Sequence, residues 1–297
     1  MLEKYIMNVN QPLKYSIIIP AHNEENFIGK TLESVVQQTV LPHQLIVVND
    51  NSTDQTEKIV QKFTKKHSFI QCIHSSSKSN QHLPGNKIVE AFYKGFEKLN
   101  PNWDIIVKLD ADVILPKNYF EEILKIYSSH PKAGIVGGLA MIEKNNQWVY
   151  ENIGNKKQVR GPFKSYSRSC FESIGGLKKS IGWDVVDELI SRFYGYEIIV
   201  LEELKVKLQK PTGINYQKIH GVKVGESFYK MDYGFLISFI AATKFAWNKK
   251  NFKILIDIFK GYWENYRTNQ PKIVTAEEGR FIRNYRWKGI KNKLLFK

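Results

Sequence analysis

Two patterns of apolar positions alternate along the first half of the chain, short apolar runs and apolar residues at helical spacing. Short apolar runs, rich in β-branched residues or containing glycine, predict five strands, at residues 15–20, 44–50, 69–74, 104–112 and 133–142. Between them, apolar residues at helical spacing predict helices, three of which begin near residues 24, 86 and 116. Strands and helices that alternate with short loops are typical of βαβ units. We therefore expect a Rossmann-like α/β fold, with a mostly parallel sheet flanked by helices.

The alternation weakens after about residue 148. A loop-rich section precedes residues 182–204, which predict a loop, a helix of about ten residues and a strand. From residue 229 onward the pattern is helical, aromatic and basic. We therefore expect one α/β domain over residues 1–228 and a helical, basic C-terminal extension over residues 229–297.

Composition supports a folded domain in a reducing compartment. Apolar residues make up 42% of the 297 positions, which allows a sizeable core. Cys72 and Cys170 have no neighbours at metal-ligand spacing, so we expect neither a zinc site nor a disulfide framework. The N-terminus lacks the pattern of a secretory signal, and no apolar run reaches the roughly 18–20 residues of a membrane span. These features predict a cytoplasmic protein.

The net charge of +15 is unevenly spread along the chain. Residues 241–297 hold 14 Lys/Arg and four Asp/Glu. Such an excess suits an anionic membrane face, an anionic substrate or a nucleic acid. No recognised nucleic-acid motif is present, so we expect no nucleic-acid partner. A basic α/β protein that binds nucleic acid or membrane stays as an alternative class.

The apolar run at residues 105–107 ends in two carboxylates one residue apart, Asp110 and Asp112. Ligands of open α/β sheets bind at the carboxyl ends of the strands. Two close carboxylates repel each other unless a cation lies between them, and Mg²⁺ or Mn²⁺ prefers such oxygen ligands. The pair therefore predicts a divalent cation shared with a phosphate. A solvated acidic turn is the simpler alternative.

Two earlier strands also end in polar loops, at residues 20–25 and 49–54. Because carboxyl ends of parallel strands share one sheet edge, these loops are expected to line a nucleoside near Asp50. Asn23 and Asp54 also qualify as simple helix caps. Lys87, at a helix start, suits contact with a diphosphate, with a solvated surface lysine as the alternative.

The motifs together resemble those of the family 2 glycosyltransferases, which have the A-type glycosyltransferase (GT-A) fold. In chain order they are SIIIPAHNEENFIGKTLESV, LIVVNDNSTDQT, KLDADVILP, GGL and GWDVVDEL, and the resemblance covers about residues 14–225. It implies a nucleotide-sugar donor, a divalent cation (Mn²⁺ or Mg²⁺) and inversion at the anomeric carbon. It also implies a nucleotide-sugar half over about residues 14–142 and an acceptor half over about residues 143–228.

The resemblance also implies roles for individual residues. The nucleoside pocket is expected to contain Pro20, Ala21, Asn23 and Glu24, and Asp50 is expected to contact the base. Asp110, Ala111 and Asp112 form the D-x-D motif, with Asp112 on the metal-diphosphate and Asp110 nearer the ribose. Lys87 stands in place of the arginine that many relatives carry.

The expected general base is a carboxylate near residue 184. Counted back from Gly195-Tyr196, Asp184 falls on the base position of the family, and Trp183 stands where a glutamate is usual. Asp187 and Glu188 lie one turn further on and are rivals. Asp184 as a simple helix cap, and Trp183 as a core residue rather than a sugar platform, are the alternatives.

His220 follows the acceptor region and is a candidate third metal ligand, or else a loop histidine with no ligand role. Lys223 is a weaker candidate for contact with the departing diphosphate. In the tail, the basic end suits an anionic membrane surface, whereas residues 233–247 are expected to cover the sheet or a dimer partner.

We therefore predict an inverting glycosyltransferase that acts in surface polysaccharide or glycolipid synthesis, with a UDP-sugar as the favoured donor and a glycan or lipid-linked acceptor. We expect it in the cytoplasm. A peripheral location at the inner face of the cell membrane, and a homodimer, are both open alternatives. A non-catalytic sugar-nucleotide-binding protein is a further alternative.

Overall fold

The computed structural model describes residues 12–75, 86–153, 155–211 and 221–295. Within these ranges the protein has one nine-stranded sheet of order β3-β2-β1-β4-β8-β6-β9-β5, with β7 paired to β6. The strands are β1 (Tyr15–Ala21), β2 (Gln44–Asp50), β3 (Ile70–Ser75), β4 (Ile105–Leu109), β5 (Val113–Ile114), β6 (Ala133–Lys144), β7 (Gln147–Tyr150), β8 (Phe163–Ser167) and β9 (Glu197–Leu208).

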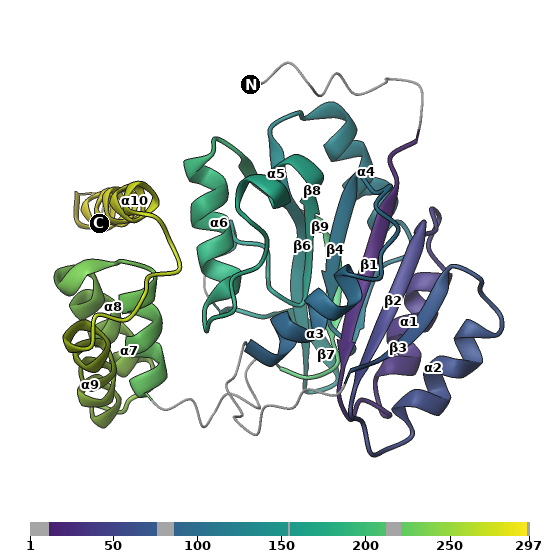
Figure 1. Cartoon of the computed structure of the whole chain (residues 1–297), viewed down its shortest axis with the longest axis horizontal. Helices are drawn as coiled ribbons and strands as arrows, with labels where there is room; N and C mark the ends of the chain where they lie inside the picture. The colour runs from purple at the N-terminus through teal and green to yellow at the C-terminus, as the bar shows by residue number, and fades with distance from the viewer. Residues whose placement is uncertain (1–11, 76–85, 154, 212–220, 296–297) are drawn as a thin grey trace.

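Ten helices accompany this sheet in the described ranges (Figure 1). They are α1 (Ile28–Val36), α2 (Thr56–Thr64), α3 (Asn86–Phe96), α4 (Tyr119–Ser129), α5 (Arg168–Ser173), α6 (Trp183–Phe193), α7 (Gly221–Lys230), α8 (Gly234–Asn248), α9 (Lys253–Arg267) and α10 (Ala276–Leu295). The five strands expected from the apolar runs are therefore present as β1, β2, β3, β4 and β6.

The first four of these strands form the parallel half of the sheet. β1 pairs in parallel with β2 on one side and with β4 on the other, and β2 pairs in parallel with β3. All seven residues of β2 and all five of β4 are buried, which explains the apolar runs at residues 45–48 and 105–107. The polar ends of β1, β2 and β4 consequently share one edge of the sheet.

The other half of the sheet is mixed. β8 lies between β4 and β6 and runs antiparallel to both, whereas β6 and β9 are parallel. Residues 163–167 belong to the section that we expected to be loop-rich, and three of their five side chains are polar. All five are buried nonetheless, and the Lys164 and Ser165 side chains donate hydrogen bonds inside the protein.

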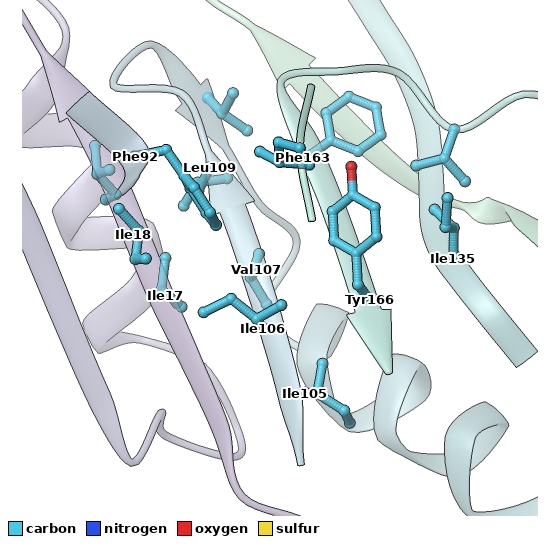
Figure 2. Packing of buried hydrophobic residues seen from close by; sticks show 14 of the residues in the cluster. Ile17, Ile18, Phe92, Ile105, Ile106, Val107, Leu109, Ile135, Phe163 and Tyr166 are labelled. Atoms are coloured by element: carbon cyan, nitrogen blue, oxygen red, sulfur yellow. The ribbon is translucent and has the colours of Figure 1, made fainter. Parts of the chain in front are cut away.

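The core lies between the sheet and the helices that cover it. Figure 2 shows Ile17 and Ile18 of β1, Val107 of β4, Tyr166 of β8 and Ile135 of β6 in one apolar cluster. Each of these side chains is at most 1% exposed. Burial at this density gives the sheet edge a rigid base.

The C-terminal helices form a group beside the α/β body (Figure 1). α7 packs closely against α9, where Gly225 and Gly261 allow the two backbones to touch. α7 begins at Gly221, so it crosses residue 228, where we expected the domain boundary. Val224 of α7, Ala242 of α8 and Ile258 of α9 form a second small core.

The two ends of the C-terminal region differ in which side chains are exposed, and the sequence did not indicate this difference. On α10, Arg283 donates to the Asp232 carbonyl at 3.0 Å and Arg286 donates to the Tyr233 hydroxyl at 2.5 Å, so both basic side chains turn inward. On α8, the buried side chains are small or few, and most large apolar ones are exposed. Residues 233–247 therefore do not cover the sheet with their whole apolar face.

Candidate active site

Asn23 joins the loop after β1 to the loop after β2. Its backbone has a left-handed φ of 55°, its amide donates to the Ser52 hydroxyl at 3.1 Å, and its side-chain oxygen accepts from the Thr53 amide at 2.8 Å. α1 begins only at Ile28 and has no side-chain cap. The alternative in which Asn23 caps this helix is therefore wrong, because its side chain is used between the two loops.

Asp54 does act partly as a cap. Its carboxylate accepts from the Thr56 amide at 2.9 Å at the start of α2 and from the Glu25 amide at 3.0 Å in the first loop. Pro20 and Ala21 end β1 directly before this loop. The two loops expected to line a nucleoside thus form one hydrogen-bonded unit.

Asp50 ends β2 and points its carboxylate toward the end of β3. The Ser75 hydroxyl donates to this carboxylate at 3.0 Å, and Lys94 of α3 donates to the same hydroxyl at 2.7 Å. Asp50 is 8% exposed. This places a carboxylate with a fixed orientation at the edge where a base is expected.

The D-x-D turn is tied to two other parts of the chain. The Thr31 hydroxyl of α1 donates to the Ala111 carbonyl at 2.7 Å, and the Gln209 amide donates to the Asp112 carbonyl at 2.9 Å. Directly after the turn, β5 pairs with the end of β9. The end of β9 therefore lies beside the D-x-D motif.

This neighbour brings a lysine into the acidic cluster. The Lys210 ammonium lies 2.7 Å from the Glu24 carboxylate and 3.4 Å from that of Asp112. Burial, and then the charge of Asp110, raise the pKa of Asp112 to about 6, although Lys210 opposes the shift. Burial likewise raises the pKa of Glu24. The cluster therefore has more negative charge than one ammonium balances.

A second lysine connects Asp110 with the opposite side of the site. Lys108, 1% exposed, donates to the Asp110 carboxylate and to the Gly161 carbonyl, the latter at 3.2 Å. Its ammonium also lies 5.0 Å from the ring centre of Trp183. A Cβ at Gly161 would lie 3.2 Å from the Asp184 carboxylate oxygen. Asp110 and Asp184 thus both lie next to the Lys108–Gly161 contact.

A third lysine lies beneath the start of α6. Lys164, fully buried, donates to the Asp184 carbonyl at 2.5 Å and to the Asp187 carboxylate at 2.9 Å, and lies 3.3 Å from Glu188. Burial opposes its charge, but the three acids keep its pKa raised. The Tyr166 hydroxyl also donates to Asp187 at 2.6 Å. Asp187 is therefore paired and enclosed, at 1% exposure.

Asp184 has a different environment. It lies half-buried in the first turn of α6, whose N-cap is Gly182 with a left-handed φ of 77° and no side-chain cap. The alternative of Asp184 as the helix cap is therefore wrong. Trp183 is 6% exposed and belongs to the core, which supports the packing alternative over the sugar platform.

The donor chemistry of the D-x-D region fits a divalent cation. Asp110, Asp112 and Glu24 supply carboxylate oxygens, which are the ligands that Mg²⁺ prefers. Burial, followed by the charge of Asp110, raises the pKa of Asp112, and a bound cation would oppose this shift. In the part of the chain that the structure describes, no group of three or more His, Cys, Asp or Glu is arranged to hold a metal by itself. Further ligands would have to come from a diphosphate or water.

The remaining candidates are spread around the same edge. Lys87 lies half-buried in the first turn of α3, and Lys223 pairs with Glu226 on α7 at 2.7 Å. A shallow hollow between α3, α7 and the loop before α6 is lined by Asn86, Ser180, Ile181, Lys223, Glu226, Ser227 and Lys230. His220 lies outside the described residues.

Sequence reasoning missed the three lysines that organise the site. Lys108 and Lys164 occupy positions inside buried strands, where an ammonium is costly unless it is paired. A lysine within an apolar run that ends in acids, as in residues 105–112, was the available signal for Lys108. Nothing local marked Lys210, because its partner Glu24 is 186 residues away in the chain.

Comparison with protein families gives a match over more than half of the chain. The model of the family described as Glycosyl transferase family 2 matches residues 16–178. A probable glycosyltransferase, YdaM of Bacillus subtilis (strain 168), is 34% identical over 224 residues, which are 66% of this chain and 51% of YdaM. The putative glycosyltransferase EpsH of the same organism is 25% identical over 171 residues, 57% of this chain and 45% of EpsH. The chain thus spans about half the length of these relatives.

Solved structures share the fold at low sequence identity. S. aureus TarS 1-349 in complex with UDP-GlcNAc has a TM-score of 0.56 and 16% identity, over 92% of this chain and 79% of that one. The mannosyltransferase PcManGT from Pyrobaculum calidifontis, in complex with GDP-Man and Mn²⁺, has a TM-score of 0.53 and 16% identity, over 73% and 62% of the two chains. At this identity the likeness concerns the fold.

Proposed function

The protein belongs to glycosyl transferase family 2, and from this premise we propose that it transfers a sugar from a nucleotide-diphosphate sugar to an acceptor hydroxyl. The predicted GT-A type of α/β fold and the helical C-terminal region are confirmed. The proposal adds the direction of attack, the residues and the substrates.

One relationship carries the proposal. Lys108 contacts both the Asp110 carboxylate and the Gly161 carbonyl, Gly161 lies next to the Asp184 carboxylate, and the nucleoside loops and Asp50 lie on the same sheet edge as Asp110. A sugar between the two carboxylates would have its diphosphate toward Asp110 and Asp112 and its other face toward Asp184. This arrangement suits attack opposite to the leaving group.

In this mechanism Asp184 is the general base. The acceptor oxygen forms a bond to the anomeric carbon while the bond from that carbon to the diphosphate oxygen breaks, and its electron pair leaves with the nucleotide. The acceptor proton passes to the Asp184 carboxylate. Inversion follows because bond formation and bond breaking occur on opposite faces.

The pairing of Asp187 favours Asp184 in this role. Asp187 already accepts from Lys164 and Tyr166 and has almost no exposed surface. An acceptor hydroxyl could reach it only after these partners had moved. The proposed role of Asp187, with Lys164, is to fix the start of α6.

Asp110 and Asp112 are the residues proposed to hold Mn²⁺ or Mg²⁺ with the donor. A divalent cation there would neutralise the charge that the departing diphosphate gains. Lys210 is positioned to add positive charge on the same side, next to Glu24 and Asp112. Lys87 remains the candidate for a further diphosphate contact.

The proposed substrates are a UDP-sugar and a hydroxyl of a surface polysaccharide or glycolipid. Acceptors of this kind are assembled at a membrane, so the proposal includes a peripheral location at the cytoplasmic face. A sugar-nucleotide-binding protein without catalysis would need the same donor side but not a free carboxylate at Asp184.

A panel of nucleotide diphosphates and nucleotide sugars, tested by thermal shift with Mn²⁺ and with chelator, tests the proposal. We expect one nucleotide to raise the melting temperature in the presence of the metal, and the matching nucleotide sugar to be consumed when an acceptor is supplied. No shift with any member of the panel would refute the donor site. Stabilisation without turnover would favour the binding protein.

A further inference from the structure

The C-terminal helices α8 and α9 carry a large exposed apolar surface. On α8 the exposed side chains include Phe235, Leu236, Phe239, Ile240 and Trp247. Their spacing places them on one face of the helix, over about four turns. Leu236 is 63% exposed and Trp247 is 71% exposed, values that are unusual for such side chains in a monomer.

The surface continues onto α9. Phe252, Ile256, Trp263 and Tyr266 recur at helical spacing and are all more than half exposed. Phe259 joins the two helices, since its ring centre lies 5.9 Å from that of Phe235 and 5.5 Å from that of Phe239. We call these exposed residues of α8 and α9, with Phe259, the apolar patch.

Lysines surround the apolar patch. Lys244 lies at its edge on α8, Lys249 and Lys250 in the turn between the helices, and Lys253 and Lys260 on α9, and all five are exposed. Residues 234–256 contain no Asp or Glu. The patch is therefore both apolar and positively charged at its rim.

From this combination we propose that the apolar patch binds the surface of an anionic lipid bilayer, with α8 and α9 lying in the plane of the interface. Aromatic side chains and Trp are favoured at the boundary between head groups and acyl chains. Each lysine near an anionic surface contributes about 1 kcal/mol. In the described part of the chain, no helix has the length and apolarity to cross a membrane, so the proposed contact is interfacial.

A second copy of the chain is the rival occupant, and the charges disfavour it. A two-fold contact through the apolar patch would pair the patch with itself. It would therefore bring the lysine rims of two chains together. Lys260 is paired with Glu264 at 4.0 Å, whereas Lys244, Lys249, Lys250 and Lys253 have no salt-bridge partner among the described residues. Anionic head groups supply that balance.

The proposed contact uses the first part of the basic end. The sequence predicted membrane contact for the whole basic end, from Lys249 to Lys288, but Arg283 and Arg286 of α10 are engaged with Asp232 and Tyr233. The inference does not depend on glycosyl transfer, so it can fail while the proposed function stands.

Flotation of the full chain with vesicles tests the proposal. We compare phosphatidylcholine vesicles with vesicles of phosphatidylcholine and phosphatidylglycerol. Wild type is expected to float with the anionic vesicles and much less with the neutral ones. Leu236→Ser with Trp247→Ser should lower the partition coefficient about tenfold or more, as should Lys249→Glu with Lys250→Glu.

Matched controls lie elsewhere on the surface. Leu41→Ser with Ile153→Ser removes apolar side chains that are 49% and 46% exposed, and Lys65→Glu with Lys66→Glu reverses a neighbouring pair of exposed lysines. These variants should float like wild type. A melting temperature for each variant shows that the fold is intact.

Two outcomes would overturn the proposal. One is that wild type fails to float with anionic vesicles at low salt, or that the patch variants float as well as the controls. The other is that light scattering gives a dimer without lipid and a monomer for the Leu236→Ser, Trp247→Ser variant, which would assign the patch to a second copy.

Discussion

Lys108 and Lys164 are direct register partners on the antiparallel strands β4 and β8, and both side chains are almost completely buried. Their ammonium groups contact different acids of the site. Lys108 contacts Asp110 and the Gly161 carbonyl, whereas Lys164 contacts the start of α6. The two cations thus set the spacing between the acids of the D-x-D turn and the helix that carries Asp184.

Replacing the proposed base should stop turnover without unfolding the protein. For Asp184→Asn we expect turnover to fall by about 10²–10⁴-fold, with donor-induced thermal shift retained. For Asp187→Asn we expect the melting temperature to fall, because a buried partner of Lys164 is lost, while folded molecules keep most of their activity. If Asp184→Asn retained near-normal turnover with metal and donor bound, the assignment of the base would be wrong.

Gly161 offers a finer test of the same geometry. A Cβ at this position would lie 3.2 Å from the Asp184 carboxylate and 3.4 Å from Trp183, so the carboxylate must shift by a few tenths of an ångström. Gly161→Ala should therefore lower turnover by about tenfold and leave donor binding unchanged. The matched control is Gly29→Ala, whose Cβ would make an ordinary 3.6 Å contact with Ile59. Equal activities of the two variants would contradict this geometry.

Removal of the Lys164 ammonium should destabilise the fold strongly. Lys164→Met leaves the buried acids Asp187 and Glu188 without their cation, and breaking such a pair costs about 3–5 kcal/mol of unfolding free energy. Urea unfolding measures this loss. Lys125→Met, which removes an exposed lysine paired with Glu121 and Glu122, should hardly change the midpoint. Adding Asp187→Asn to Lys164→Met should cost less than the sum of the two single changes.

Glu188 should make the unfolding free energy depend on pH. Burial, opposed by Lys164, raises its pKa from 4.5 to about 7. Between these values the folded state binds more protons than the unfolded state, so the contribution of Glu188 to stability falls as pH rises from about 4.5 to 7.

Glu188→Gln isolates this contribution, because glutamine resembles the protonated side chain. The free energy of unfolding of the variant, relative to that of wild type, should be higher at pH 8 than at pH 5 by up to about 3 kcal/mol. Urea titrations of both proteins at the two pH values measure the difference. A difference that did not change with pH would show that Glu188 is ionised throughout this range.

Lys210 should lower the affinity of the protein for Mn²⁺ alone and raise its affinity for the nucleotide diphosphate. Its ammonium lies among carboxylates that a metal would also contact. Lys210→Met should therefore tighten binding of Mn²⁺ alone, as titration calorimetry would measure, and weaken binding of the nucleotide diphosphate that stabilises wild type. Lys30→Met, an exposed change on α1, is the control. Weaker Mn²⁺ binding in Lys210→Met would contradict the assigned role.

The parallel half of the sheet, and the edge where its acids lie, could be predicted from the sequence. The apolar runs of β1, β2 and β4 were recognisable because strands buried on both faces contain short runs of apolar side chains. Asp50, Asp110 and Asp112 directly follow or end such runs, so their shared edge followed from parallel pairing. The family was recognisable from the same motifs.

The pairing of charged side chains became visible in the tertiary structure. β8 is polar in sequence but buried, because its lysine and serine side chains find partners on α6 and β6. Lys210 reaches Glu24 across 186 residues, and Asp187 differs from Asp184 because Lys164 and Tyr166 enclose it. Local patterns report burial and periodicity, whereas the pairing of distant charges depends on how strands far apart in the chain are ordered in the sheet.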